Sequence, residues 1–593
     1  MATDQASRTS GDPVALLETI FRDAFGTVLG DAGRDADPLV RTGRNPQFGD
    51  YQVNGVMGLA KQARTNPREL AGRIVEAAAG ALDAIAEPAE VAGPGFINIR
   101  LKPEALAAML DDFDTPRLGL APDADTRAIA IDLCGVNIAK QMHVGHLRST
   151  IIGDTLARVM ERCGRTVHRQ NHLGDWGLTI AMVLQELRDR KADLDALSLD
   201  DLDAAYRAAQ AADDDADRDK QTLIRLQQGD DELLRDWRKI IDVTMRAVYE
   251  SFDLLGVRLG AENNRPESFY RDRLGAVVDE FLAAGLAETD QGAIIVRFPD
   301  RKRPLIIRKS DGGFLYSTTD LAAVKYRVQE LGACRVIYVV DARQRDHFRD
   351  VFDAIRLIGW DRLADGDTAQ LVHVPFGSVL GADRTPLKTR SGENVPLSAL
   401  LNEAIDRATT EVRKRAAVPD SPTHDLSDET LASIGRAIGI GAIKYADLSS
   451  DLVRDYVFNL DRMIAFEGNT GPYIQYAHAR VCSIFGKAGL ELDEDLRRLG
   501  PYVIREPPEK TLALALLRYP GVVRDVAESL EPHRLCTYLF ELANAYSAFY
   551  ENCPVLKAEG EARRHSRLRL CHIVRRVLAD GLDLLGIDAP TRM

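Results

Sequence analysis

The segment from 128 to 170 carries the pattern that most restricts the fold of this chain. An apolar run, AIAIDL, precedes a stretch whose apolar residues recur at helical spacing, among them Leu147 and Ile151, and a second short run, TVHRQ, follows it. Gly164 stands directly after the helical pattern, where the glycine that ends a helix belongs. Strand, helix and strand in this order place two parallel strands in one sheet. VIYVV and LVHVPF have the composition of further buried strands, so we predict an α/β domain with a parallel sheet.

The length and the changes in composition divide the chain into several domains. A chain of 593 residues is too long for a single hydrophobic core, and about three or four domains are expected. Residues 1–122 mix helical spacing with a turn and strand, VAGPGFINIRL, which indicates an α+β domain, and APDADTR looks like a linker behind it. The α/β domain is expected to span 126–420. Residues 425–593 carry helical apolar spacing and no convincing strand, so we predict an all-α domain there.

Within the α/β domain the composition changes between about 185 and 260, where Asp, Ala, Lys and Arg dominate. We interpret this segment as an exposed helical insertion. A disordered acidic spacer would have a similar composition, and that alternative stays open at this point.

The charge and composition argue against several classes of protein. Hydrophobic residues make up 45% and charged residues 28%, as in ordinary globular proteins, and no run of about 18 uncharged apolar residues predicts a membrane span. The polar N-terminus lacks the apolar core of a secretory signal. A net charge of −14 argues against nonspecific binding to DNA but leaves room for a specific RNA partner. Seven cysteines without a CxxC pair argue against disulfides and structural zinc and favour the reducing cytoplasm.

The turn after the first strand of the α/β domain holds the candidate chemistry. It lies where open α/β sheets bind ligands, yet it has neither GxGxxG nor GxxxxGK[ST]. It contains His143, Gly145 and His146, with Lys140 just before them. Two imidazoles, an ammonium and a helix N-terminus suit transfer at the α-phosphate of ATP, and Gly145 would let a flat base or sugar approach the backbone. Zinc binding by the histidines, or a purely structural pair, are the alternatives.

This turn resembles the HIGH signature of class I aminoacyl-tRNA synthetases. The matching residues are Val136, Asn137, Ile138, Ala139, Lys140, Gln141, Met142, His143, Val144, Gly145 and His146. Further blocks follow in an order similar to that of arginyl-tRNA synthetases: NHLGDWG, SDGGFLYSTTDLAAVKYR, YVVDARQRDHF, HVPFGSVLG, YVFNLDRMIAFEGNTGPYIQYAHAR and FYENCPVL. A single block could mislead, but the ordered set is specific and covers most of the chain.

The resemblance implies an activity and a fold. It implies a Rossmann-type nucleotide-binding catalytic core, and an enzyme that joins L-arginine to ATP, releases diphosphate and passes the arginyl group from an adenylate to the terminal ribose of tRNA(Arg). Members of this family typically need bound tRNA before they activate arginine. Magnesium should accompany ATP, held mostly by phosphates and water, and we expect no protein metal ligand. The resembled family is usually monomeric and no heptad segment would force a dimer, so we expect a monomer.

The same resemblance implies a set of arginine-binding residues. Asp320 would pair with the guanidinium, Tyr316 would flank the substrate, and Glu267 would be a second acidic partner. Asn137 and Gln344 would position the α-amino and carboxyl ends. Recognition of a planar guanidinium calls for acidic partners in a fixed arrangement. Asp320 could instead cap a helix that begins with LAAVKYR, and Tyr316 and Gln344 could have purely structural roles.

The ATP-binding residues implied by the resemblance are His143, Gly145, His146, Gly174 and Asp175. The two histidines would contact the phosphates and stabilise the developing charge rather than shuttle protons. Asp175 and its neighbour Trp176 could instead pack and cap the following helix.

One motif departs from the class. The second class I signature, Lys-Met-Ser-Lys-Ser, is replaced by a loop that reads ADRTPLKTRSGENVPL. Lys140 is expected to take over the role of the missing cation, with Lys388 and Arg390 as supporting candidates, so the catalytic set comprises these three cations and the two histidines. An exposed basic loop without a catalytic part is the alternative.

Two terminal domains acquire RNA-binding roles by resemblance. The C-terminal helices are similar to the family's anticodon-binding module, which would read unpaired bases by stacking and hydrogen bonds. The N-terminal domain is similar to one that contacts the tRNA elbow. Candidate tRNA contacts are Phe48, Tyr51, Gln52, Tyr473, Gln475, Tyr476 and Met593. Buried helix faces, a loop-to-helix transition or a frayed end would account for the same residues.

Two rival functions remain at this point. A related adenylate-forming enzyme with a small carboxylic-acid substrate would have no need of an RNA-reading domain. A noncatalytic tRNA-binding paralogue would not be expected to retain His143, His146, Asp320 and Gln344 together.

Overall fold

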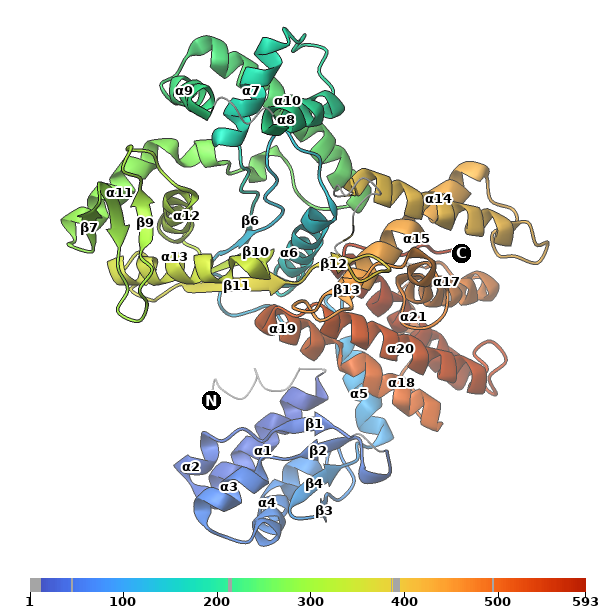
Figure 1. Ribbon diagram of the computed structural model, residues 1–593. Helices are drawn as coiled ribbons and strands as arrows, with labels where there is room; N and C mark the ends of the chain where they lie inside the picture. The colour runs from blue at the N-terminus through green and yellow to red at the C-terminus, as the bar shows by residue number, and fades with distance from the viewer. Residues whose placement is uncertain (1–11, 44–45, 212–215, 386, 388–394, 493–494) are drawn as a thin grey trace.

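The computed structural model describes residues 12–43, 46–211, 216–385, 387, 395–492 and 495–593. Figure 1 shows an N-terminal domain in blue, an α/β part in cyan to yellow, and a helical C-terminal part in orange to red. No helix in the described ranges is long and apolar enough to cross a membrane.

A four-stranded parallel sheet forms the centre of the α/β part. Its strands lie in the order β11 (Gln370–Phe376), β10 (Arg335–Asp341), β5 (Ile129–Asp132) and β6 (Val167–Gln170). Helix α6 (Val144–Arg162) joins β5 to β6. Gly164 follows α6 with a φ of +91°, a conformation that glycine adopts at little cost. The predicted strand–helix–strand unit and both further strands are confirmed.

The first insertion after β6 is helical in the described residues. It comprises α7 (Leu178–Asp189), α8 (Leu199–Ala211), α9 (Ala216–Gln227) and α10 (Asp231–Leu255). These helices lie together beyond the β6 end of the sheet, at the top of Figure 1. The helical interpretation is confirmed for these residues, and a disordered spacer is wrong for them.

A second insertion was not predicted from the sequence. It consists of α11 (Leu274–Ala283) and three antiparallel strands, β7 (Ala287–Asp290), β8 (Ala293–Val296) and β9 (Leu305–Arg308). After this insertion the chain forms α12 (Tyr316–Lys325), then the parallel strand β10, then α13 (Arg345–Ile358). The strands are only four residues each, and β7 is polar, so neither length nor alternation marks them in the sequence.

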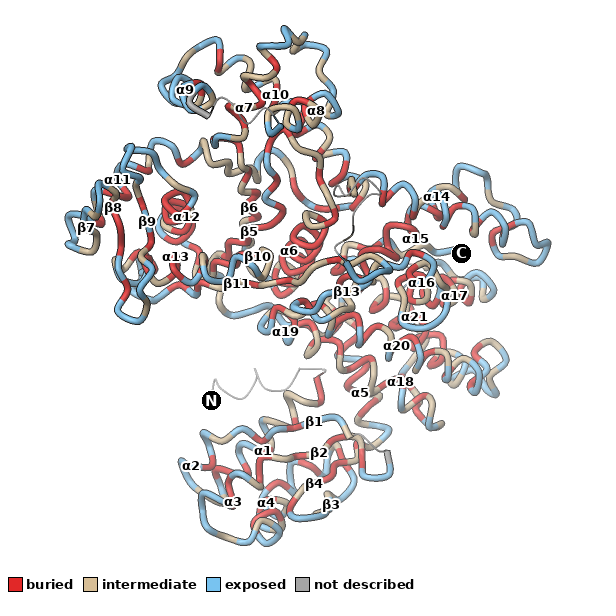
Figure 2. The backbone as a smooth tube through the Cα atoms, in the orientation of Figure 1, coloured by how far each residue is buried: buried red, intermediate tan, exposed pale blue. Residues whose placement is uncertain are grey.

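The two faces of the parallel sheet bury different helices. Ile131 and Val339 belong to the hydrophobic cluster that contains α6, whereas Ala130 and Tyr338 belong to the cluster that contains α12 and α13. Successive residues of a strand point to opposite faces, so this division shows that both faces are covered. Figure 2 shows the consequence, since α6 and β5 are buried along almost their whole length.

The C-terminal part is helical. Its helices are α14 (Leu397–Ala416), α15 (Asp428–Leu448), α16 (Leu460–Met463), α17 (Gly471–Ala488), α18 (Pro507–Leu517), α19 (Tyr519–Ser529), α20 (His533–Asn552) and α21 (Glu561–Leu584). One departure from the predicted all-α character is β13 (Tyr456–Val457), which pairs in parallel with β12 (Val379–Leu380) of the α/β part. Two residues are too few to leave a strand pattern in the sequence.

Buried charged side chains join α15 to the rest of the molecule. The ammonium of Lys444 is fully buried and donates to the carbonyl oxygens of Leu255, at the end of α10, and Gly586, behind α21, at 2.7 and 2.5 Å. Arg148 of α6 and Asp447 of α15 form a second buried contact, with Nε and Oδ2 3.1 Å apart. These contacts hold α15 against α6, the end of α10 in the first insertion and the residues that follow α21.

The N-terminal domain is α+β, as predicted. An antiparallel sheet in the order β1 (Val40–Thr42), β2 (Tyr51–Val53), β4 (Phe96–Ile99) and β3 (Glu90–Ala92) packs with α1 (Pro13–Leu29), α2 (Asp31–Arg34), α3 (Val56–Ala63) and α4 (Pro67–Leu82). Helix α5 (Pro103–Phe113) leaves this domain and packs against α18 (Figure 1). Asp114, behind α5, accepts hydrogen bonds from Arg576 at 2.7 Å and from the buried Arg569 at 3.2 Å.

Candidate active site

The signature turn begins α6 with two histidines that cap the helix. His143 is the N-cap residue, and its Nδ1 accepts a hydrogen bond from the Gly145 N–H at 3.0 Å. The His146 Nδ1 accepts from the His143 N–H at 3.1 Å, and the two ring centres lie 3.9 Å apart. Two of the N–H groups that a helix start leaves unpaired are thereby satisfied by imidazoles. The histidines therefore have a structural function, whatever else they bind.

The protonation state of the two rings follows from these bonds. Because each Nδ1 accepts, a neutral ring carries its proton on Nε2, which is free to donate. Burial is the main cause that lowers the pKa of His146 to about 3, and His143 and Lys140 contribute to the same shift. Burial also lowers the pKa of His143, with Lys140 and Arg343 adding to the effect. Near neutral pH the turn thus holds two neutral imidazoles with Nε2–H donors.

Two glycines are required by the side chains beside them. A Cβ on Gly145 would lie 2.8 Å from Cε1 of His143, so the glycine makes room for that ring; this is a local reason for it beyond the predicted approach of a ligand. A Cβ on Gly174 would lie 2.2 Å from Oδ1 of Asn137. The turn and the 171–177 loop are also joined by backbone bonds, from the Ile138 N–H to the Gly174 carbonyl and from the Gly174 N–H to the Val136 carbonyl, each 3.0 Å.

The remaining signature residues hold the turn in place. Val136, Ile138, Ala139, Met142 and Val144 are buried. Ala139 has a φ of +65°, which costs a non-glycine residue energy, and its N–H donates to Oγ1 of Thr244 on α10 at 3.1 Å. The turn is therefore held against the first insertion.

Asp175 and Trp176 both make packing contacts of the kind that the alternative interpretation expects. Asp175 is buried and accepts hydrogen bonds from the N–H and the hydroxyl of Ser268, at 2.9 and 2.6 Å. The Trp176 ring packs edge-on against Trp237 of α10. Neither caps α7 through a side chain, since its N-cap residue is Gly177. Through its two hydrogen bonds Asp175 instead holds Ser268, the residue that follows Glu267.

Two carboxylates gather near the predicted arginine site. Glu267 is largely buried, and burial raises its pKa; His172 opposes this shift, while Asp175 and Asp320 add to it. The influence of Asp320 on Glu267 shows that the two carboxylates lie within electrostatic range of each other. Asp320 also pairs with Nε2 of His347 on α13, at 2.6 Å. Two acidic groups, one of them paired with an imidazole, are a suitable start for binding a guanidinium.

Asp320 is not a helix cap. Helix α12 begins at Tyr316, its N-cap residue is Leu315, and Asp320 is the fifth residue of the helix, so the capping alternative is wrong. The Tyr316 ring is 62% exposed and lies 4.8 Å from the His347 ring, centre to centre. Gln344 is exposed directly before α13. Both side chains are therefore accessible beside the Asp320–His347 pair, as a substrate-flanking role requires.

Of the three cations expected at the phosphates, the structure describes Lys140 alone. Lys140 is half-buried, and its Nζ lies 4.1 Å from the ring centre of Tyr206 on α8. Lys388 and Arg390 lie outside the described residues. The chain behind them returns to the signature turn, because Pro396 pairs with His143 and the Leu397 N–H donates to the Met142 carbonyl at 2.8 Å.

The N-terminal tRNA candidates differ in exposure. Phe48 is 58% exposed and Gln52 half-buried, and both line a cavity of about 660 Å³ together with Arg41 and Asn98. Tyr51 is 1% exposed in the core of the domain, so its side chain cannot contact RNA in this conformation. That expectation was wrong because Tyr51 alternates with Gln52 on β2 and faces the helices.

The C-terminal candidates divide in the same way. Gln475 is fully buried and donates to the carbonyl oxygens of Ala437 and Asp588, so it holds the C-terminal tail and is not available to a base. Tyr476 is 39% exposed, and Tyr473 donates from its hydroxyl to Asn544 at 2.8 Å. Met593 packs against the cluster between α14 and α15 and is not frayed.

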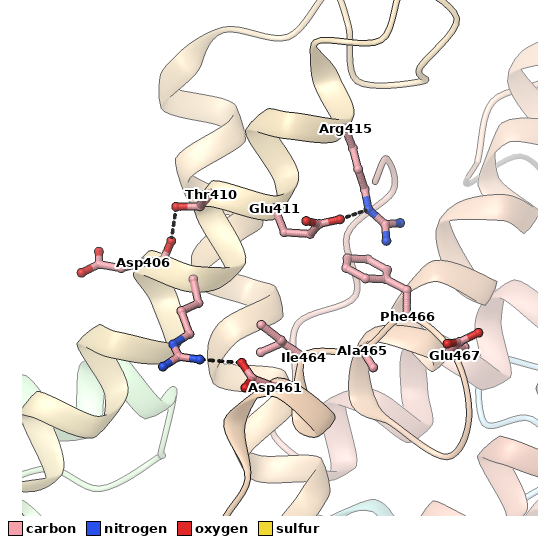
Figure 3. A pocket seen from close by; sticks show the side chains of 10 residues that line it. Asp406, Thr410, Glu411, Arg415, Asp461, Ile464, Ala465, Phe466 and Glu467 are labelled. Atoms are coloured by element: carbon pink, nitrogen blue, oxygen red, sulfur yellow. Dashed lines mark hydrogen bonds and ion pairs between the residues drawn. The ribbon is translucent and has the colours of Figure 1, made fainter.

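A cavity of about 820 Å³ lies between α14 and the segment 461–467, which begins within α16 (Figure 3). Arg415 lies over the Phe466 ring, with its guanidinium carbon 3.7 Å from the ring centre, and Arg407 pairs with Asp461 at 2.5 Å. Phe466 belongs to the periphery of the same cluster as Met593. The sequence does not reveal this cavity, because its residues come from two segments about 50 positions apart with no shared motif.

Three family models match successive parts of the chain. Residues 117–460 match tRNA synthetases class I (R), catalytic domain; residues 474–593 match the DALR anticodon binding domain; residues 15–101 match the arginyl tRNA synthetase N terminal domain. The parallel sheet, the signature turn and the match of residues 117–460 to the catalytic-domain model together define a class I aminoacyl-tRNA synthetase.

Relatives that match the chain along almost its whole length identify the family within this class. The chain is 45% identical to an arginine–tRNA ligase of Cellvibrio japonicus, over 94% of this chain and 96% of that one, and 44% identical to that of Thermobifida fusca, over 98% and 100%. The arginyl-tRNA synthetase structure from Plasmodium falciparum superposes with a TM-score of 0.83 at 28% identity, covering 99% of this chain and 100% of that one. The chain belongs to the arginyl-tRNA synthetase family.

Proposed function

We propose that this enzyme attaches L-arginine to tRNA(Arg) in two steps at the site described above. In the first, an arginine carboxylate oxygen attacks the α-phosphorus of ATP; a P–O bond forms, the bond to the β-phosphate breaks, and diphosphate leaves. In the second, a terminal ribose hydroxyl attacks the acyl carbon of the adenylate and AMP leaves. The positions of two groups behind neighbouring parallel strands carry this proposal. The Nε2–H donors of the signature turn follow β5, and His347, the partner of Asp320, lies on the helix that follows β10.

Arginine would enter with its guanidinium toward the carboxylates. Asp320 already has a hydrogen-bonded partner in His347, so it can present an oriented oxygen to a planar donor. A guanidinium would also offset the burial and repulsion that raise the pKa of Glu267. Tyr316 would cover the aliphatic stem, and Asn137, fixed against Gly174, would meet the α-amino or carboxyl end together with Gln344.

ATP would place its phosphates over the start of α6. The His143 and His146 Nε2–H groups would donate to phosphate oxygens while staying neutral, so that they stabilise charge without shuttling protons. Lys140 would supply a full positive charge, with Lys388 and Arg390 of the loop assigned a supporting part. Magnesium would enter with ATP on phosphate and water oxygens, because Mg²⁺ keeps several waters and is bound largely through substrate phosphates.

tRNA would contact the two outer domains. We assign the elbow to the cavity lined by Phe48 and Gln52, and the anticodon loop to the exposed Tyr476 and the cavity beside Arg415 and Phe466, where a flat base can stack. Met593 supports this second surface by packing. Tyr473, whose hydroxyl is engaged by Asn544, is kept as a candidate at its edge.

The setting of the enzyme is proposed on composition. All seven cysteines are free thiols, which suits a reducing cytoplasm. We propose a monomer that acts on tRNA and arginine, without DNA or membrane as partner.

The test is arginine-dependent exchange of labelled diphosphate into ATP, measured with and without tRNA(Arg). Exchange only in the presence of tRNA supports the two-step course and the proposal that bound tRNA completes the site. Exchange without tRNA keeps the adenylate and refutes the requirement for tRNA. Folded protein that shows no exchange with arginine and tRNA together would refute the proposed course.

A further inference from the structure

The lysine of the signature turn rests on an aromatic ring that belongs to the first insertion. Lys140 Nζ lies 4.1 Å from the centre of the Tyr206 ring on α8, within the range of a cation–π contact. The next residue is held by the same helix, since Gln141 Nε2 donates to Asp200 Oδ1 at 2.8 Å. Helix α8 therefore contacts the turn at two consecutive side chains.

The charge of Lys140 is not neutralised where it lies. Within the described ranges no carboxylate pairs with its ammonium. Lys325 provides the contrast, because its Nζ also lies over a ring, that of Trp360 at 4.4 Å, but is paired with both carboxylate oxygens of Glu280 at 2.7 and 2.6 Å. An aromatic face attracts an ammonium without a counter-charge, so the cation stays available to an anion.

The position of this charge suits the phosphate site. Lys140 precedes His143 by three residues, and its charge contributes to lowering the pKa of both His143 and His146. A lysine side chain has four rotatable bonds, and fixing them costs conformational entropy. If the ammonium is already held in place before ATP binds, less of this entropy is lost on binding.

We propose that Tyr206 is a positioning residue for Lys140, whose ring holds the ammonium beside the signature histidines with its N–H donors available to the phosphates of ATP. The proposal deepens the function above and rests on the role given there to Lys140. It makes the first insertion part of the nucleotide site through a residue that itself contacts no substrate.

The experiment is a double-mutant cycle in the full-length enzyme, read as kcat/KM for ATP in diphosphate exchange with tRNA present. Lys140→Gln is expected to lower this value about 100-fold. Tyr206→Leu should lower it about three- to tenfold, and Tyr206→Phe, which keeps the ring, should stay within about twofold of wild type. In the Lys140→Gln background, Tyr206→Leu should have no further effect. Melting curves for each variant establish that it is folded.

A matched control breaks another cation–ring contact. Arg480 lies 4.3 Å from the centre of the Tyr550 ring on α20, and Tyr550→Leu should leave kcat/KM for ATP unchanged. A loss on Tyr206→Leu that is equally large without Lys140, or one that Tyr206→Phe reproduces, would overturn the positioning role. A silent Lys140→Gln variant would refute instead the phosphate role of Lys140, so the two failures can be told apart.

Discussion

At the scale of single residues, the 171–177 loop offers a direct test of how Asn137 is positioned. A Cβ at Gly174 would lie 2.2 Å from Oδ1 of Asn137, whereas one at Gly177 would meet no atom within 4 Å. Gly174→Ala should therefore displace the Asn137 amide and raise KM for arginine about tenfold or more, because binding through a misplaced amide is lost. Gly177→Ala should leave it unchanged. Steady-state aminoacylation at varied arginine measures both, and equal KM values for the two variants would refute the prediction.

Single residues also show what a sequence can and cannot reveal about a site. His143, His146 and Asp320 were found because they sit in ordered motifs. The structure places the two histidines at the start of α6, after β5, and Asp320 against His347 on the helix that follows β10. Tyr51 and Gln475 sit in equally strong motifs but are buried, because a motif does not distinguish a residue that meets a ligand from one that holds its neighbours. Tyr206 carries no motif at all, and only the fold places it beside Lys140.

At the scale of secondary-structure elements, the contact between α6 and α15 depends on a buried ion pair. Arg148 and Asp447 are 1% and 0% exposed at their side chains. Arg148→Met would leave a carboxylate buried without its partner, and we expect the free energy of unfolding to fall by about 3–5 kcal/mol. Adding Asp447→Leu should restore much of this loss, since an apolar pair replaces the charges.

The control for this prediction is an exposed pair of the same residue types. Arg34 and Asp31 are 74% and 100% exposed at their side chains, so Arg34→Met should cost less than about 1 kcal/mol. Denaturant unfolding followed by tryptophan fluorescence measures all variants. A loss at Arg148 no greater than that at Arg34 would contradict the prediction.

Elements differ in how far the sequence predicts them. α6 and the parallel strands were predicted because their apolar residues follow the periods of a helix and of doubly covered strands. The sheet β7–β9 was missed because its strands are short and its first strand is polar, and β12–β13 because two residues set no period. These elements exist through pairing with distant segments, which local periodicity does not record.

At the scale of the whole molecule, helix α5 belongs by contact to the C-terminal helices although it follows the N-terminal domain in the chain. It packs against α18, and Asp114 behind it pairs with Arg569, whose side chain is 2% exposed, and with Arg576. A chain that begins at Lys102 keeps these contacts, whereas one that begins at Arg117 leaves Arg569 without Asp114. The second fragment should therefore melt at least about 5 °C below the first.

Differential scanning calorimetry of the two fragments and the full chain checks this expectation. Both fragments lose the contacts that Arg524 and Lys510 make with Asp12 and Asp50 of the N-terminal domain, so those contacts do not affect the comparison. Equal melting temperatures would show that α5 contributes nothing to the helical part.

Lys444 links segments that lie far apart in the chain. Its ammonium donates to the carbonyl of Leu255, 189 residues before it, and to that of Gly586, 142 residues after it. Before Gly586 has been translated, this buried charge has only one of its two acceptors. A chain cut short before Gly586 would thus lack one of the contacts that hold α15 in place, even though every residue predicted at the ATP and arginine sites had been translated.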